Sequence, residues 1–224
     1  MFRGVTAPAL GAAYAVFAMQ LAELPTDTRR LLLLTAAGSG YESMATITAA
    51  AGHGAGAAAW QPALSAGLIT VTGDRRPEFC HPLARAAAYA ESSLSQRRQA
   101  HLALAAVLKS EPSCRAWYLA AAATGPEEHI AQSLEAASQL SFRRGGYLEV
   151  ARALQRAAEL SPDQESAARR FATAAAAANF AGDTEWATSL CGNAAVAIRD
   201  ADTTAYATST RASILMQSAR PTVK

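Results

Sequence analysis

Apolar positions along this chain recur mainly with the period of an α-helix. Near the N-terminus they fall at i, i+4, i+7, i+11 and i+14, which predicts one buried stripe on an amphipathic helix: Leu10, Tyr14, Phe17, Leu21 and Leu24. A signal peptide is the alternative interpretation of the uncharged stretch 4–22. The stripe and the mild hydrophobicity favour the helix, and we expect a cytoplasmic protein.

Three short helices are predicted next, over about 26–37, 42–51 and 57–66, and glycines end each of them. The period then changes at 68–72, where the β-branched residues cluster. The turn Gly73-Asp74 and a second short run at 78–80 complete a predicted β-hairpin. Three helices followed by a hairpin is the order of a winged helix.

The rest of the chain predicts helices without further strands. Two cover about 82–90 and 94–109, and the second of these places Leu94 and His101 on its buried face. Pro112 and Pro126 each stand where a first-turn proline begins a helix. Ser161 is the predicted N-cap of a helix over 164–180, and two more helices follow at about 184–199 and 203–218.

The second half contains a repeated pattern. Two sets of residues occur 37 positions apart and match the back half of a tetratricopeptide repeat: Gly145, Leu154 and Ala157, then Gly182, Cys191 and Ala194. The pattern predicts stacked helical hairpins, and a generic alanine-rich bundle is the alternative. We therefore expect a mainly α protein, with a winged-helix-like part in 1–109 and a helical-repeat array in 110–224.

Composition supports the helical prediction. The chain contains 58 Ala and 22 Leu against 5 Ile and 7 Val, which disfavours a parallel sheet or a β-sandwich. The net charge of +2 indicates no basic field for nucleic acid or anionic lipid. The cysteines Cys80, Cys114 and Cys191 are too scattered for a disulfide framework or a metal site, and we expect them to be buried thiols.

Patterns for catalysis are missing from the sequence. The only lysines, Lys109 and Lys224, do not follow a glycine, which excludes a phosphate-binding loop. The stretch Gly52–Ala57 formally fits a dinucleotide fingerprint, but no buried strand is predicted before it. The four histidines lie at least twenty residues apart, without metal-ligand spacing. We expect no enzyme activity, no metal and no cofactor.

Direct DNA binding is a weaker hypothesis than an adaptor role. The predicted helix over 57–66 offers Trp60 and Gln61 but no basic residue to the base edges of DNA. Arg75 and Arg76, at the tip of the predicted hairpin, are the remaining candidates for phosphate contacts.

Several motifs together resemble one family. In chain order they are LAELPTDTRRLLLL (21–34), FCHPLAR (79–85), RAWYLA (115–120), GPEE (125–128), RGGY (144–147) and AAELSPD (157–163). They are similar to the central part of large LuxR-type regulators of actinobacteria, which are signal-transduction ATPases with numerous domains. The resemblance implies an ATPase, a winged helix, a helical-repeat sensor and a C-terminal DNA-binding unit, and this chain matches only the middle two.

The resemblance suggests a sensor fragment that binds a protein partner or a small-molecule inducer through its repeats and relays that signal. A freestanding repeat scaffold and a small winged-helix DNA-binding regulator are the alternatives. By resemblance, His81 and Arg85 would sense a nucleotide, His81 through a phosphate, whereas capping of a helix is the alternative role for His81. Aromatic side chains dominate interface energetics, and the candidate anchors for a partner are Tyr147, Trp186 and Tyr206.

The concave groove formed by the first helices of successive hairpins, here about 164–180 and 203–218, is the expected place for the partner. The small residues 172–178 would let a partner helix approach closely. Burial between the repeats is the alternative for the aromatic residues, and we favour it for Trp186.

Overall fold

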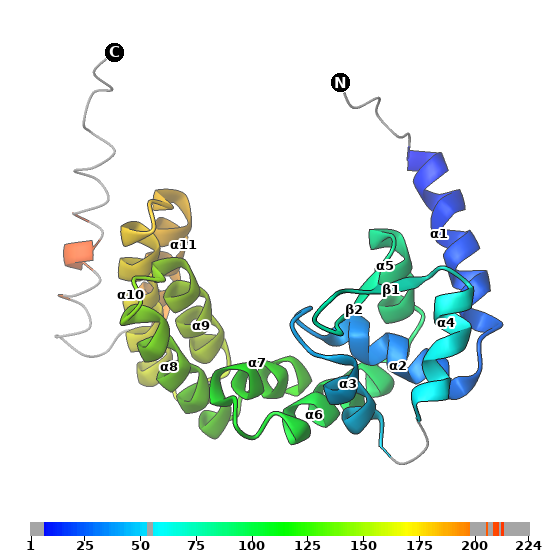
Figure 1. Cartoon of the computed structure of the whole chain (residues 1–224). Helices are drawn as coiled ribbons and strands as arrows, with labels where there is room; N and C mark the ends of the chain where they lie inside the picture. Colours follow the sequence, from blue (N-terminus) through cyan, green and yellow to red (C-terminus); the bar gives the residue numbers. More distant parts are fainter. Residues whose placement is uncertain (1–6, 53–55, 198–204, 206–207, 211, 213–224) are drawn as a thin grey trace. The chain divides into compact units, whose positions relative to one another are not determined.

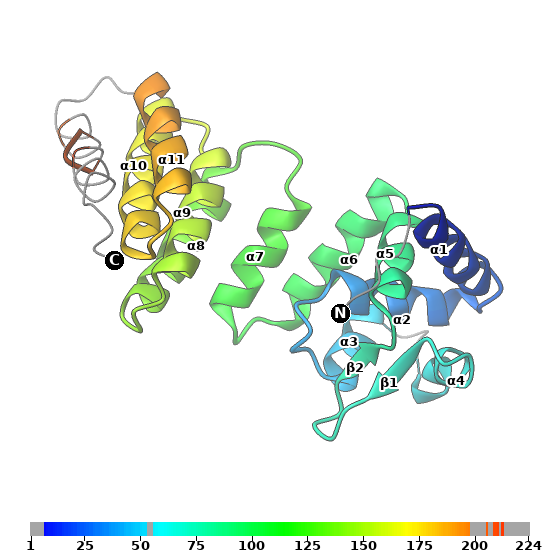
Figure 2. The ribbon, with the colours of Figure 1, turned by 90° about the horizontal axis from the view of Figure 1, so that it is seen from above.

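The computed structural model describes residues 7–52, 56–197, 205, 208–210 and 212. It divides into two compact units, unit 1 over 1–110 and unit 2 over 111–224. Both are mainly helical, and the described residues contain one sheet, a two-stranded antiparallel hairpin in unit 1 (Figures 1 and 2). The prediction of a mainly α chain with one hairpin is confirmed.

One helix forms the centre of unit 1. This helix, α2 (Thr26–Ala37), packs against α3 (Met44–Ala51), α5 (Pro82–Ala90) and α6 (Leu94–Val107). Its run Leu31–Leu34 is buried throughout because neighbouring helices cover it on several sides. The predicted N-terminal helix is α1 (Ala7–Ala22), and it packs on α5 (Figure 2).

The hairpin has short strands. β1 (Ile69–Val71) pairs with β2 (Pro77–Phe79), with Ile69 opposite Phe79. The second strand begins at Pro77, one residue before the predicted run. A proline is tolerated there because a two-stranded hairpin has only edge strands, where a missing N–H breaks no central ladder.

The prediction of one continuous helix over 57–66 is wrong. The chain makes a 3-10 turn, η1 (Ala57–Trp60), followed by the short helix α4 (Gln61–Ser65). Pro62 explains the break, because it has no N–H to donate to the carbonyl of Ala58, and Gln61 donates to that carbonyl instead. Trp60 is buried in this segment, and its indole N–H donates to the Thr48 hydroxyl at 2.9 Å.

Two predictions of side-chain burial, one for Leu94 and one for the cysteines of both units, are also corrected. Leu94 is the first residue of α6, and its side chain is 81% exposed although His101 on the same predicted face is buried. Leu94 lies in the first turn of α6, before the buried positions of that helix begin at Ala100. Cys80 and Cys114 are exposed, and only Cys191 is a buried thiol.

Unit 2 consists of helices that pack in chain order. They are α7 (Pro112–Ala122), α8 (Glu128–Phe142), α9 (Tyr147–Glu159), α10 (Gln164–Phe180) and α11 (Thr184–Ala197), each against the next (Figure 1). Small side chains let these helices approach closely, as at Ala131, Ala157 and Ala175, which are fully buried. The predicted helix at 203–218 lies mostly outside the described residues.

The turns that join α8 to α9 and α10 to α11 have the same geometry. Gly145 and Gly182 both adopt positive φ, +74° and +88°. The next residue in each turn donates its N–H to a carbonyl five residues earlier, Gly146 to Ser141 at 3.0 Å and Asp183 to Ala178 at 3.1 Å. This is the Schellman pattern that ends a helix with a left-handed residue.

The positions that follow each turn are buried in matching pairs 37 residues apart. The pairs are Val150 and Ala187, Leu154 and Cys191, and Ala157 and Ala194. Two helical hairpins therefore share both their turn and their buried face, as the 37-residue pattern predicts.

Two further predictions in unit 2 are corrected. The N-cap of α10 is Asp163, whose carboxylate accepts the N–H of Ser166 at 2.8 Å, and not Ser161. The Ser161 hydroxyl instead donates to the carbonyl of Ala157 and accepts from Arg170. The stretch 172–178 is mostly buried against α9 and α11 and offers little surface to a partner.

Candidate functional site

His81 stands at the start of α5. Its Nδ1 accepts the N–H of Leu83 at 3.0 Å, so the imidazole caps the helix. The ring also stacks on Phe17 of α1, with the ring centroids 5.3 Å apart. These contacts fit the capping role that was the alternative for His81. The side chain is nonetheless exposed, with Nε2 on the other edge of the ring.

Arg85 lies one turn further along α5 and reaches the end of α2. Its Nε and Nη2 each donate to the carbonyl of Ala36 at 3.2 Å, and Nη2 also donates to Gly38 at 2.6 Å. The guanidinium thus caps the carbonyl end of the central helix, where a positive charge also opposes the helix dipole. His81 and Arg85 both hold helix ends.

The arginines of the hairpin have different surroundings. Arg76 pairs with Asp74 and lies 5.6 Å from the centre of the Tyr41 ring. Arg75 is exposed and adopts a positive φ of 60° in the turn. One of the two candidate phosphate contacts is therefore already paired with an acid.

Aromatic side chains gather on the surface of unit 2 where helix ends meet. Tyr147, the first residue of α9, packs edge-on against Phe142 at the end of α8, with ring centroids 5.9 Å apart. It also packs against Phe180 at the end of α10, at 5.4 Å. Phe142 and Phe180 are 59% and 72% exposed. We call these three residues the aromatic patch.

The surroundings of the aromatic patch are apolar and basic. Leu140 and Leu148 are 43% and 37% exposed beside it in the sequence. Arg143 and Arg144 directly follow Phe142, both are exposed, and neither forms an ion pair with a described residue. Exposed aromatic rings beside unpaired arginines are the composition found at the centre of protein interfaces.

The other two predicted anchors differ from Tyr147. Trp186 is half-buried against the core of α9, α10 and α11, and its indole N–H donates to Gln155 at 2.8 Å. That position fits the burial between repeats that we favoured for Trp186. Tyr206 lies outside the described residues. Phe142 and Phe180 were not predicted as site residues, and the available signal was the place of Phe180 at the end of the predicted helix over 164–180.

An ionic cluster connects the two helical hairpins of unit 2. Arg170 of α10 is 2% exposed and donates to both oxygens of Glu128, at 2.7 and 3.0 Å. It also donates to Glu135 at 2.9 Å and to the Ser161 hydroxyl at 2.5 Å. Hydrogen bonding to Arg170 lowers the pKa of Glu128 and raises that of the guanidinium. Each of the three guanidinium nitrogens has a protein partner, so the cluster is structural.

Within the described part of the chain, no group of three or more His, Cys, Asp or Glu side chains is placed to hold a metal ion. The described helices include none of the length and apolar character needed to cross a bilayer. Comparisons with protein-family models, with curated proteins and with solved structures find no match to this chain.

Proposed function

We propose that this chain is a regulatory module without enzyme activity, in which unit 2 is a tetratricopeptide-like array that binds a protein partner. The observation that supports this most is the recurrence, after 37 residues, of one turn geometry and one set of buried positions. Arrays of such hairpins expose a continuous surface, and proteins use that surface to bind other proteins.

The aromatic patch is the proposed contact surface. Two of its rings are more than half exposed, although burying such a ring is worth about 1.5–3 kcal/mol. A partner that inserted apolar side chains between Phe142 and Phe180 would cover them. Arg143 and Arg144 add unpaired positive charge beside the rings, so the proposed partner is a protein segment with apolar anchors flanked by carboxylates.

Unit 1 fits the winged-helix part of this proposal. Within it, the helical segments α2, α3 and η1–α4, followed by the hairpin and α5, have the order of a winged helix. Together with the repeats, it supports the resemblance to the central part of LuxR-type regulators, in which such a module would relay occupancy to neighbouring domains in the cytoplasm. A freestanding scaffold would use the same patch. A DNA-binding role is less well supported, because α4 has no basic residue and Arg76 is paired with Asp74.

Site-specific photo-crosslinking tests this proposal. We would replace Phe142 of the full chain with p-benzoylphenylalanine and irradiate it in a lysate of the source organism. The matched control places the same group at Leu94, an apolar residue of unit 1 that is 81% exposed. The proposal predicts one saturable adduct at Phe142 that is absent at Leu94 and is lost with Phe180→Ser. No adduct at Phe142, or the same adduct at both positions, would contradict it.

A further inference from the structure

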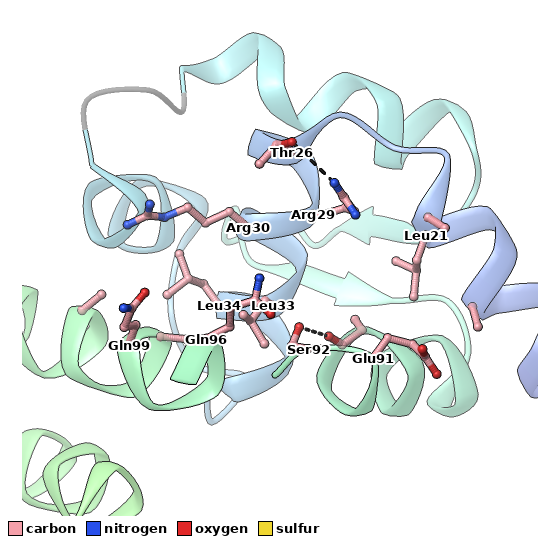
Figure 3. A pocket seen from close by; sticks show the side chains of 15 residues that line it. Leu21, Thr26, Arg29, Arg30, Leu33, Leu34, Glu91, Ser92, Gln96 and Gln99 are labelled. Atoms are coloured by element: carbon pink, nitrogen blue, oxygen red, sulfur yellow. Dashed lines mark hydrogen bonds between the residues drawn. The ribbon is translucent and has the colours of Figure 1, made fainter. Parts of the chain in front are cut away.

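Unit 1 contains a pocket of about 470 Å³ that lies over one face of α2 (Figure 3). The end of α1, the end of α5 and the first half of α6 complete its walls. Leu21, Leu33 and Leu34 supply an apolar floor and are themselves almost fully buried. The volume is within the range of about 300–1,000 Å³ that small-molecule sites occupy.

Two adjacent arginines of α2 line the polar side of this pocket. Figure 3 shows that they leave the helix in opposite directions, with Arg29 on the side of Leu21 of α1 and Arg30 on the other side. Arg29 makes one long hydrogen bond, 3.5 Å to the Thr26 hydroxyl. Arg30 makes no hydrogen bond or ion pair with the described residues. Because a guanidinium has five N–H donors, nearly all of this capacity is available to a ligand.

The charge at the pocket is positive. Glu91 is the one acid among the lining residues, and its carboxylate accepts the Tyr14 hydroxyl at 2.7 Å. In Figure 3 that carboxylate is directed away from Arg29 and Arg30. The two guanidinium groups are therefore not neutralised by the protein, and they lie beside an apolar floor.

From this geometry we infer that the pocket binds a small amphipathic carboxylate. The carboxylate pairs with Arg29 or Arg30, since a guanidinium binds a carboxylate through two parallel hydrogen bonds. The apolar body of the ligand lies against Leu21, Leu33 and Leu34. The inference that a carboxylate binds here depends only on the pocket. The further inference that this ligand is the signal that the chain senses depends on the proposed regulatory function.

Calorimetric titration of the full chain with decanoate tests this inference. The expected result is one saturable site that decylammonium, of equal chain length and opposite charge, does not occupy. The double substitution Arg29→Gln and Arg30→Gln weakens decanoate binding at least about tenfold, because the charged partner of the carboxylate is lost. The matched control is a pair of exposed arginines elsewhere in unit 2, Arg115→Gln and Arg152→Gln, which leaves the affinity unchanged.

A second variant tests the pocket without removing charge. Ala103→Phe places a ring in the pocket from the α6 wall and is expected to abolish decanoate binding, with the helical circular dichroism retained. The inference is overturned if decanoate does not saturate a site, if decylammonium binds equally well, or if the arginine substitutions leave the affinity unchanged. Binding to phosphatidylglycerol vesicles in place of decanoate would also overturn it. These titrations need no protein partner, so their failure is distinct from failure of the crosslinking at Phe142.

Discussion

Arg170 and Glu128 form a bidentate ion pair across unit 2, with nitrogen–oxygen distances of 2.7 and 3.0 Å. Arg170 comes from the first helix of one hairpin and Glu128 from the first helix of the preceding one. The pair therefore connects two consecutive helical hairpins through side chains that lie 42 residues apart in the sequence. A buried arginine of this kind fixes the register between helices, because any shift would leave its charge unpaired.

Removing Arg170 is expected to destabilise the chain strongly. Arg170→Ala leaves a cavity and two facing carboxylates, and we predict a loss of about 3 kcal/mol in the free energy of unfolding. Arg170→Met keeps most of the packed volume and is expected to cost less. Urea unfolding followed by circular dichroism measures both. Arg169→Ala, at an exposed neighbour, is the control, and an equal effect of Arg169→Ala and Arg170→Ala would show that the cluster is not stabilising.

Because His101 is buried, we predict that the free energy of unfolding depends on pH in the acid range. Burial lowers the pKa of this imidazole, whose Nε2 lies 2.9 Å from the Tyr89 hydroxyl. Between the usual histidine pKa of about 6.5 and the lower folded value, the unfolded chain binds more protons. The free energy of unfolding therefore carries no penalty from His101 above about pH 6.5, and it falls as the pH is lowered through this window.

The substitution His101→Gln tests whether His101 causes this pH dependence. The variant is expected to lose this part of the pH dependence in thermal unfolding measured between about pH 7 and pH 5. A His101→Gln profile parallel to that of the wild type would assign the acid sensitivity to other groups.

The positive φ at the repeat turns predicts opposite effects for two glycine substitutions. The methyl group added by Gly182→Ala would meet no atom within 4 Å. The expected loss in the free energy of unfolding, about 1–2 kcal/mol, therefore comes from the left-handed backbone alone. Gly192 lies within helix α11, also with open space around it, and Gly192→Ala is expected to stabilise by about 0.5–1 kcal/mol. Melting temperatures of the two variants should move in opposite directions. Stabilisation by Gly182→Ala would argue against the turn geometry on which the repeat rests.

Local signals in the sequence predicted much of the fold. The β-branched run at 68–72 indicated the hairpin, and the first-turn proline Pro112 marked the start of α7. The same prediction for Pro126 is wrong, because α8 begins at Glu128 with Glu127 as its N-cap, so Pro126 lies outside the first turn. Glycines 37 residues apart indicated the two equivalent turns. These features depend on backbone preferences of a few adjacent residues, which a single sequence contains.

Tertiary contacts account for what the sequence did not predict. Ser161 has the residue type and spacing of an N-cap, but its hydroxyl is engaged by Arg170, and Asp163 caps α10 instead. Phe142 and Phe180 become neighbours of Tyr147 only when three helix ends meet. The pocket on α2 likewise needs four helices, so neither proposed site was visible as a motif.

The most direct test of the account is the affinity of the crosslinked partner, measured by calorimetry with the full chain. Phe142→Ser combined with Phe180→Ser removes two exposed rings and leaves the buried core of unit 2 intact. Because a few aromatic side chains supply most of the energy of an interface, we predict at least about tenfold weaker binding. Leu94→Ser, at an exposed leucine of unit 1, should leave the affinity unchanged. Equal affinity of the double variant and the wild type would contradict the proposed role of the aromatic patch.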